Sequence, residues 1–224
     1  MPRRPRVSVG GMVYHVLNRA NGRMPLFESP RDYDAFEKVL LEAHEHVSMR
    51  TLAYCVMPNH WHFVLWPHED GDLPKFMQWL TLTHTQRWHL AHETTGNGHV
   101  YQGRYKSFPI QSDKHYLTVC RYVERNALRA GLVHRAEEWP WGSLGGRTSG
   151  RSGQINVLSD GPMDWPDGWL EMVNQPMSER EEEALRRCLL RSRPFGTRSW
   201  VATTFQLLGL PAQPARVGRP RRRK

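Results

Sequence analysis

The chain has 224 residues and a formal net charge of +9, because 31 lysines and arginines outnumber 22 aspartates and glutamates. This surplus indicates a polyanionic partner. A hydrophobic fraction of 39% with 10% aromatic residues is enough to build a core, which excludes disorder for most of the chain. No apolar run approaches the roughly 18 residues that a membrane span requires, so we expect no membrane partner.

Cysteine usage and the N-terminal residues both indicate a cytoplasmic protein. Cys55, Cys120 and Cys188 form no C-x-x-C pair, which favours neither a disulfide framework nor a thiolate zinc knuckle. Residues 1–11 carry three arginines without the apolar run of a secretory signal peptide.

The first half of the chain predicts a strand, a helix and a hairpin. Residues 13–18 have the pattern of a strand, and the apolar positions that follow Pro30 predict a helix that runs to about residue 46. Residues 51–57 and 61–66 predict two strands that pair as a hairpin across a Pro-Asn turn.

The second half predicts more helix than strand. Residues 73–92 form an amphipathic helical pattern, residues 100–110 are extended, and residues 113–130 predict a third helix. A pair of short helices follows at residues 179–193 and 199–208. This order predicts an α+β fold, in which a ferredoxin-like antiparallel sheet packs with helices and a C-terminal helical appendage follows.

His60 and His62 form the sharpest local motif. Two residues apart on a strand, their side chains project from the same face, where two imidazoles can bind one metal ion. Trp61 then points into apolar packing on the other face. An isolated pair of this kind is also compatible with one half-exposed histidine and one hydrogen-bonded in the core.

A second motif lies in the helix predicted for residues 113–130. Tyr122 and Asn126 are four residues apart, so they share a helix face and their side chains can reach the same ligand. Tyr122 lies about 100° around the helix from Val123, beside the apolar stripe, which leaves its hydroxyl available. The alternative is an aromatic residue at the edge of the core with a hydrated hydroxyl.

Together, His60-x-His62 on a strand and Tyr122-x-x-x-Asn126 on a helix, in a basic α+β chain, resemble the single-tyrosine HUH transposases. The chain is similar in particular to the REP-associated tyrosine transposases of bacteria. The resemblance covers roughly residues 10–145 and departs from the family at Ala127, where proline is usual. It rests on four blocks in the same order: Tyr14-His15-Val16-Leu17-Asn18-Arg19, residues 57–67, Tyr101-Gln102-Gly103-Arg104-Tyr105-Lys106-Ser107, and residues 122–133.

The resemblance implies a metal-dependent enzyme. His60, His62 and Asn126 would bind a divalent cation, Mg²⁺ or Mn²⁺, and Tyr122 would be the nucleophile. The implied reaction cleaves and rejoins single-stranded DNA at hairpin-forming palindromic repeats through a 5'-phosphotyrosine intermediate. Such a transposase and endonuclease would associate with the bacterial nucleoid, as a monomer or a homodimer.

Several basic residues are candidates for DNA binding. Arg104 and Lys106 alternate along the predicted extended segment and therefore share a face. Arg121, Arg125 and Arg129 repeat every four residues along the predicted helix. Each of them is equally compatible with a solvated charged surface.

The last residues carry much of the charge. Residues 211–224 hold six basic residues and no acid, and their composition predicts disorder until a partner is bound. Within them, Gly218-Arg219-Pro220-Arg221 resembles an AT-hook, in which Arg219 and Arg221 would enter a minor groove. A tail that binds phosphates without sequence preference is the alternative.

Other functions remain compatible with the sequence. A protein derived from a transposase can keep the fold and only bind hairpin DNA, for example as a repressor. The histidines could also belong to a hydrolytic nuclease in which Tyr122 is structural, or to a structural zinc site completed by Cys55. Covalent capture of DNA separates the first interpretation from these.

The resemblance and the composition divide the chain into three parts. Residues 1–145 are expected to form the HUH catalytic domain. Residues 146–210 are expected to form a linker and a C-terminal helical region, and residues 211–224 a disordered basic tail.

Overall fold

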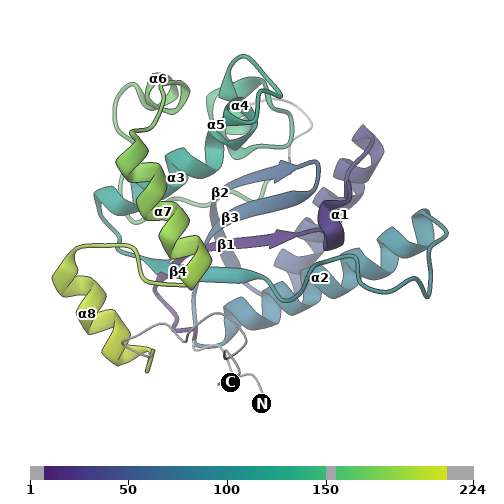
Figure 1. Cartoon of the computed structure of the whole chain (residues 1–224), viewed down its shortest axis with the longest axis horizontal. Helices are drawn as coiled ribbons and strands as arrows, with labels where there is room; N and C mark the ends of the chain where they lie inside the picture. Colours follow the sequence, from purple (N-terminus) through teal and green to yellow (C-terminus); the bar gives the residue numbers. More distant parts are fainter. Residues whose placement is uncertain (1–7, 150–154, 211–224) are drawn as a thin grey trace, which may run out of the picture.

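The computed structural model describes residues 8–149 and 155–210, so Arg219 and Arg221 lie outside the described residues. At its centre is an antiparallel sheet with the strand order β2-β3-β1-β4 (Figure 1). This is the order of a ferredoxin-like sheet, so the predicted α+β fold is confirmed. The strands are β1 Val13–Arg19, β2 Met49–Met57, β3 His60–Pro67 and β4 Lys106–Ile110.

Two layers of helices enclose this sheet (Figure 1). One face packs against α1, Pro30–His46, and α2, Asp72–Ala91. The other face packs against α3, Lys114–Glu124, and the short α4, Asn126–Arg129. The remaining helices are α5 Ser143–Ser149, α6 Trp169–Asn174, α7 Glu179–Arg191 and α8 Arg198–Leu207, with 3₁₀ turns η1 at Asn21–Arg23 and η2 at Ala136–Glu138.

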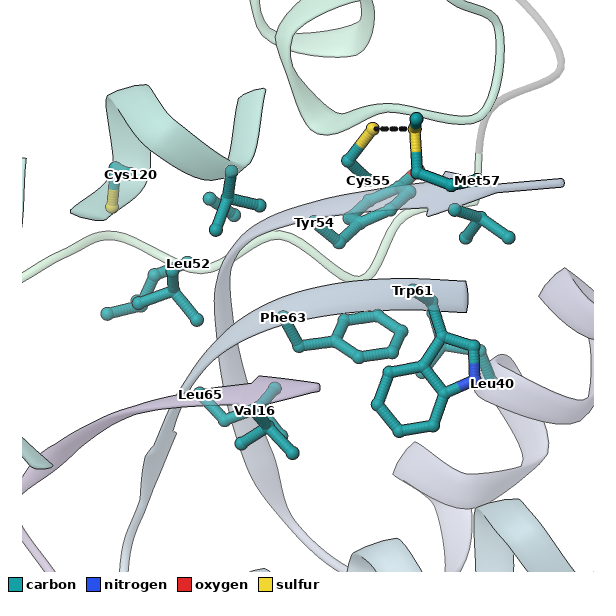
Figure 2. Close-up of a cluster of buried hydrophobic side chains, with 14 of the residues drawn as sticks. Val16, Leu40, Leu52, Tyr54, Cys55, Met57, Trp61, Phe63, Leu65 and Cys120 are labelled. Carbon is teal, nitrogen blue, oxygen red and sulfur yellow. Dashed lines mark hydrogen bonds between the residues drawn. The ribbon is translucent and has the colours of Figure 1, made fainter. Parts of the chain in front are cut away.

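Alternation along β3 separates the core from the face that carries the histidines. Trp61, Phe63 and Leu65 are fully buried, and the rings of Trp61 and Phe63 stack near Phe36 of α1. Figure 2 shows these three β3 side chains on one side of the sheet, with Cys55 on the other. Each fully buried large side chain contributes about 1.5–3 kcal/mol, and this packing fixes which face His60 and His62 occupy.

Helix α1 begins where the sequence predicts it. Ser29 precedes Pro30, and the carboxylate of Asp32 accepts hydrogen bonds from the backbone N–H and the hydroxyl of Ser29, at 2.9 and 3.0 Å. This capping box stabilises the first turn, and proline tolerates that position because its missing N–H has no helical partner there.

Two predicted elements are shorter in the structure. The extended segment predicted for residues 100–110 becomes a strand only from Lys106, because Tyr101 forms an isolated bridge with Ala20 before the chain bends. The helix predicted for residues 113–130 ends at Glu124 and resumes at Asn126. The helices predicted for residues 179–193 and 199–208 are confirmed as α7 and α8.

The C-terminal helices belong to the same hydrophobic core as the sheet. Trp169, Val173 and Leu185 are buried in the cluster that contains the strands. Helix α5 spans the expected boundary at residue 145. Among residues 8–149 and 155–210, no helix has the length and apolar character to cross a membrane.

Glu37 lies in the interface between α1 and the sheet. It is 7% exposed, and burial raises the pKa of its carboxyl to about 7. The unfolded chain loses this proton near the ordinary value, so stability falls as the pH rises from about 4.5 towards 7 and stays low above it. We expect Glu37→Gln to raise the free energy of unfolding by roughly 1–3 kcal/mol at pH 8 and to change it little at pH 4, measured by urea denaturation. Equal effects at both pH values would contradict this linkage.

Candidate active site

His60 and His62 lie on the face of β3 that is turned towards α3. Their ring centroids are 5.1 Å apart. Nδ1 of His60 contacts Oδ1 of Asn59 at 2.6 Å. Because an amide oxygen only accepts, Nδ1 of His60 carries the proton, which leaves a lone pair on Nε2 when the ring is neutral.

Helix α3 brings Tyr122 to these histidines. The ring centroid of Tyr122 lies 5.7 Å from that of His62, in an edge-to-face arrangement. Tyr122 is 8% exposed, so its ring is more deeply packed than a position beside the apolar stripe predicts. The reason is that its face of α3 also packs, against the histidine face of the sheet.

Asn126 lies one turn after Tyr122 and interrupts the helix. Its Nδ2 donates to the backbone carbonyl of Tyr122 at 3.0 Å, an oxygen that a continuous helix would offer to the Asn126 backbone N–H. Its Oδ1 accepts from Nη2 of Arg129 at 2.9 Å. The same Nη2 lies 3.4 Å from the hydroxyl of Tyr122.

His15 of β1 is a third histidine in this cluster. Its Nε2 and Nδ1 of His62 share a hydrogen bond of 2.9 Å, and both residues are buried. For Nε2 of His62 to bind a metal ion, its Nδ1 must donate to His15. A partner of this kind fixes the tautomer and orientation of a metal-binding imidazole.

The strand register adds cations to the same face. Arg19 is the cross-strand partner of His60, and Leu17 pairs with both His62 and Lys106. Arg19, Lys106 and the histidines therefore share one face at the end of the sheet where β1 ends and β3 begins. The sequence motifs are thus gathered beside a positively charged rim.

A protein-family model described as "Transposase IS200 like" matches residues 8–126. The chain belongs to this family. The match begins before β1 and ends at Asn126, so it covers the two motifs, all four strands of the sheet and the helices α1, α2 and α3. The family expected from the sequence is confirmed.

Two solved structures resemble this transposase-family chain. A REP-associated tyrosine transposase bound to a REP hairpin shares 18% sequence identity and has a TM-score of 0.54, over 80% of this chain and 99% of that chain. A transposase structure from Deinococcus radiodurans R1 shares 16% identity and has a TM-score of 0.39, over 58% of this chain and 92% of that chain. The first of them supports the fold. No match occurs among curated proteins.

The histidines of this transposase-family site are neutral at physiological pH. Burial lowers the pKa of His60 to about 4, and the charges of Arg19 and Arg129 act in the same direction. Burial also holds the pKa of His62 well below its usual value and lowers that of His15 to about 3. Neutral imidazole is the form that binds metal ions.

These side chains fit a divalent ion with one adjustment. Two neutral imidazoles are suitable donors, but Oδ1 of Asn126 is engaged by the guanidinium of Arg129, so a bound ion must share or displace that contact. In the described part of the chain, no three His, Cys, Asp or Glu side chains gather as a metal site. A site here therefore needs the amide oxygen.

Cys55 does not complete a zinc site with the histidines. It lies opposite His62 in the register of β2 and β3, as its place in the hairpin predicts. However, its Sγ contacts Sδ of Met57 at 3.6 Å, and within the described residues no three His, Cys, Asp or Glu side chains gather as a metal site. The structure gives no support to the structural zinc alternative.

Arg121 and Arg125, which we expected to contact DNA, bind carbonyl groups within the protein. Nη2 of Arg121 donates to the carbonyls of Gln175 and Pro176, at 3.0 and 3.1 Å. Nη1 of Arg125 donates to the carbonyl of Asn174 at 2.7 Å. Cations at the C-terminal end of a helix satisfy its free carbonyls, so these residues hold α6 against α3.

Arg104 and Lys106 do not share a face, in contrast to the sequence expectation. Lys106 begins β4 and lies on the histidine face, whereas Arg104 precedes the strand and lines a groove beside α2. The bend between Tyr101 and Lys106 breaks the alternation on which the expectation depended.

Glu124, two residues after Tyr122, links α3 to the helices that follow it. Its side chain is fully buried, and its carboxylate accepts from the hydroxyl of Ser143 at 2.7 Å and from Nε1 of Trp169 at 2.8 Å. Nε of Arg147 forms an ion pair with it at 3.4 Å. A carboxylate satisfied on several sides rigidifies the helix that carries Tyr122.

Two residues of the site were not identified from the sequence. His15 and Arg19 are four residues apart on β1, so strand alternation puts both on the same face. Both belong to the block Tyr14 to Arg19 that carries the family resemblance, and this was the signal that could have identified them.

Proposed function

We propose that the chain is a metal-dependent DNA transesterase that cleaves and rejoins single-stranded DNA at hairpin-forming repeats. Tyr122 is the nucleophile, and the covalent intermediate is a 5'-phosphotyrosine. The observation that carries this proposal is the meeting of Tyr122, His60, His62 and Asn126 at one end of the sheet.

The reaction exchanges one phosphodiester for another. The phenolic oxygen of Tyr122 loses its proton to solvent and forms a bond to phosphorus. The bond from phosphorus to the 3'-oxygen breaks, and this oxygen takes up a proton. Because the phosphate ester is kept on the protein, the free 3'-hydroxyl can reverse the step and rejoin strands.

The residues around Tyr122 have separate tasks in this scheme. A divalent ion held by His60, His62 and Asn126 would supply the charge that polarises a non-bridging phosphate oxygen. Nη2 of Arg129 donates towards the hydroxyl of Tyr122 and helps to orient it.

DNA reaches the site along its basic rim. Arg19 and Lys106 flank the histidines on the same face and can neutralise the phosphates on either side of the scissile bond. Hairpin DNA is the partner that we propose, because the similar solved structure is of a transposase bound to a REP hairpin. Arg121 and Arg125 act indirectly, through the position of α3.

Covalent capture tests this function. The protein is incubated with an end-labelled hairpin oligonucleotide that carries single-stranded flanks, in separate reactions that contain either Mn²⁺ or EDTA from the start. With Mn²⁺ we expect a labelled band that resists denaturant and disappears on proteolysis, and with EDTA we expect no such band. Cleavage that leaves a free 5'-phosphate and no covalent band would indicate a hydrolytic nuclease, and tight binding without cleavage would indicate a hairpin-binding repressor.

Arg129 provides a separate test of the metal site. Arg129→Leu removes a positive charge beside the imidazoles and releases Oδ1 of Asn126, so we expect Mn²⁺ to bind a few-fold more tightly, on the order of 1 kcal/mol. Covalent capture should fall in the same variant. Arg129→Lys keeps the charge and is the matched control. Calorimetric titration that gives weaker Mn²⁺ binding in Arg129→Leu would contradict the assignment of Asn126 as a ligand.

A further inference from the structure

A groove opens on the opposite side of the sheet from the histidines. It has a volume of about 790 Å³, which lies in the range of small-ligand sites. One wall is a stripe of α2 and the other is the segment 99–105, which runs back beside α2 towards β4 (Figure 1). Asn18 of β1 lies between the two walls.

The groove combines an apolar lining with amide groups. Met77, Tyr101 and Tyr105 provide apolar and aromatic surface, while Gln78 and Gln102 are exposed on the two walls. Flat apolar surfaces with a few polar groups are what a planar heterocyclic ligand requires.

Asn18 is the polar group that the fold leaves available. It is 6% exposed, and its Oδ1 accepts from the backbone N–H of Arg19 at 2.9 Å. Its Nδ2 takes part in none of the side-chain hydrogen bonds found within residues 8–149 and 155–210, and it is not one of the fully buried atoms that lack a partner. Because Asn18 lines the groove, water or a ligand there can accept a hydrogen bond from this amide.

The groove lies one strand away from the active site. The backbone N–H of Gln102 donates to the carbonyl of Arg19 at 2.9 Å, which fixes the segment 99–105 to the end of β1. Asn18 and Arg19 are neighbours, and alternation points Asn18 into the groove and Arg19 to the face of His60. A chain that crosses the end of β1 can therefore reach both.

The charge around the groove suits a nucleic acid. Arg104 is exposed and lines it, Lys106 follows on the histidine face, and none of the lining residues is acidic. The two cations mark a path for phosphates from the groove to Tyr122. The volume of about 790 Å³ is sufficient for an unpaired base.

We propose that this groove binds one unpaired base of the DNA strand that flanks the hairpin, so that it sets the register of the strand at Tyr122. Nδ2 of Asn18 donates to a ring nitrogen or carbonyl oxygen of the base, and the amide of Gln78 contacts its edge. The inference rests on the proposed function and names a recognition element within it.

The test couples changes in the protein to changes in the DNA. Hairpin oligonucleotides carry an abasic site at each flank position in turn, with flanks of dT, dA, dC or dG, and binding is measured with wild type, Gln78→Ala and Asn18→Ser. We expect one flank position at which the abasic site weakens wild-type binding by roughly tenfold. At that position the abasic site should lower the DNA affinity of Gln78→Ala or Asn18→Ser only slightly, because these variants have already lost the contact to the base.

The control is Gln86→Ala, an exposed glutamine on the same helix that does not line the groove. The abasic site should weaken DNA binding by Gln86→Ala as much as it weakens binding by wild type. If an abasic site lowers the affinity for DNA by the same factor in wild type and in every variant, at every flank position, the inference is overturned. This holds even if covalent capture by Tyr122 is intact. Conversely, a coupled position in a protein that captures no DNA would support the groove and reject the proposed chemistry.

Discussion

Tyr122→Phe is expected to reduce covalent capture of hairpin DNA by a factor of roughly 10⁴ or more, because no other side chain replaces a lost nucleophile. Binding of the same DNA should stay within a few-fold of wild type, since the ring that packs near His62 is retained. Capture is measured by the denaturant-resistant band under single-turnover conditions, and binding by fluorescence anisotropy.

The matched control is Tyr116→Phe on the same helix. Tyr116 is fully buried and lies away from the histidines, so this variant should keep capture. Persistent cleavage by Tyr122→Phe, with the phosphate attached to another residue, would show that this other residue is the nucleophile. Loss of capture in both variants would indicate that α3 is disturbed in general.

His60→Ala and His62→Ala are expected to lose capture by about 100-fold or more, but to differ in stability. His62 is buried and hydrogen-bonded to His15, so its removal leaves a cavity and an unpaired imidazole. We expect a loss of roughly 2–4 kcal/mol in the free energy of unfolding for His62→Ala. His60 is only partly buried, so His60→Ala should stay close to wild type in stability.

Mn²⁺ binding separates the metal role from the structural one. His60→Ala should lose Mn²⁺ affinity in a protein that remains folded, as judged by urea denaturation. Wild-type Mn²⁺ affinity in His60→Ala, or capture that persists in EDTA, would contradict a metal site on these histidines.

The arrangement of the candidate site could be predicted in part from the sequence because its two motifs depend on local geometry. Alternation places His60 and His62 on one face of any strand, and helical pitch places Tyr122 and Asn126 on one side of a helix. The antiparallel hairpin that carries the histidines follows from its apolar runs and its turn. These rules do not need the rest of the fold.

The tasks of the arginines could not be predicted in this way. Arg121 and Arg125 have the spacing of a solvent-facing basic stripe, but α6, about 50 positions later, returns to present its carbonyls to them. Arg129 has the same spacing and instead binds Asn126. Tertiary packing determines which of these three arginines points towards the site. The periodicity of the sequence contains no information about that packing.

The buried carboxylate of Glu124 also determines what can be exchanged between members of the family. The family model ends at Asn126, yet all three groups that satisfy Glu124, on Ser143, Arg147 and Trp169, lie beyond that residue. A buried carboxylate deprived of its partners costs several kcal/mol. A chimera that joins the matched segment of this chain to the C-terminal helices of a relative must therefore carry equivalents of Ser143 and Trp169, and of the carbonyls that bind Arg121 and Arg125. The unit that can be recombined is α3 together with the groups that bind Glu124, Arg121 and Arg125.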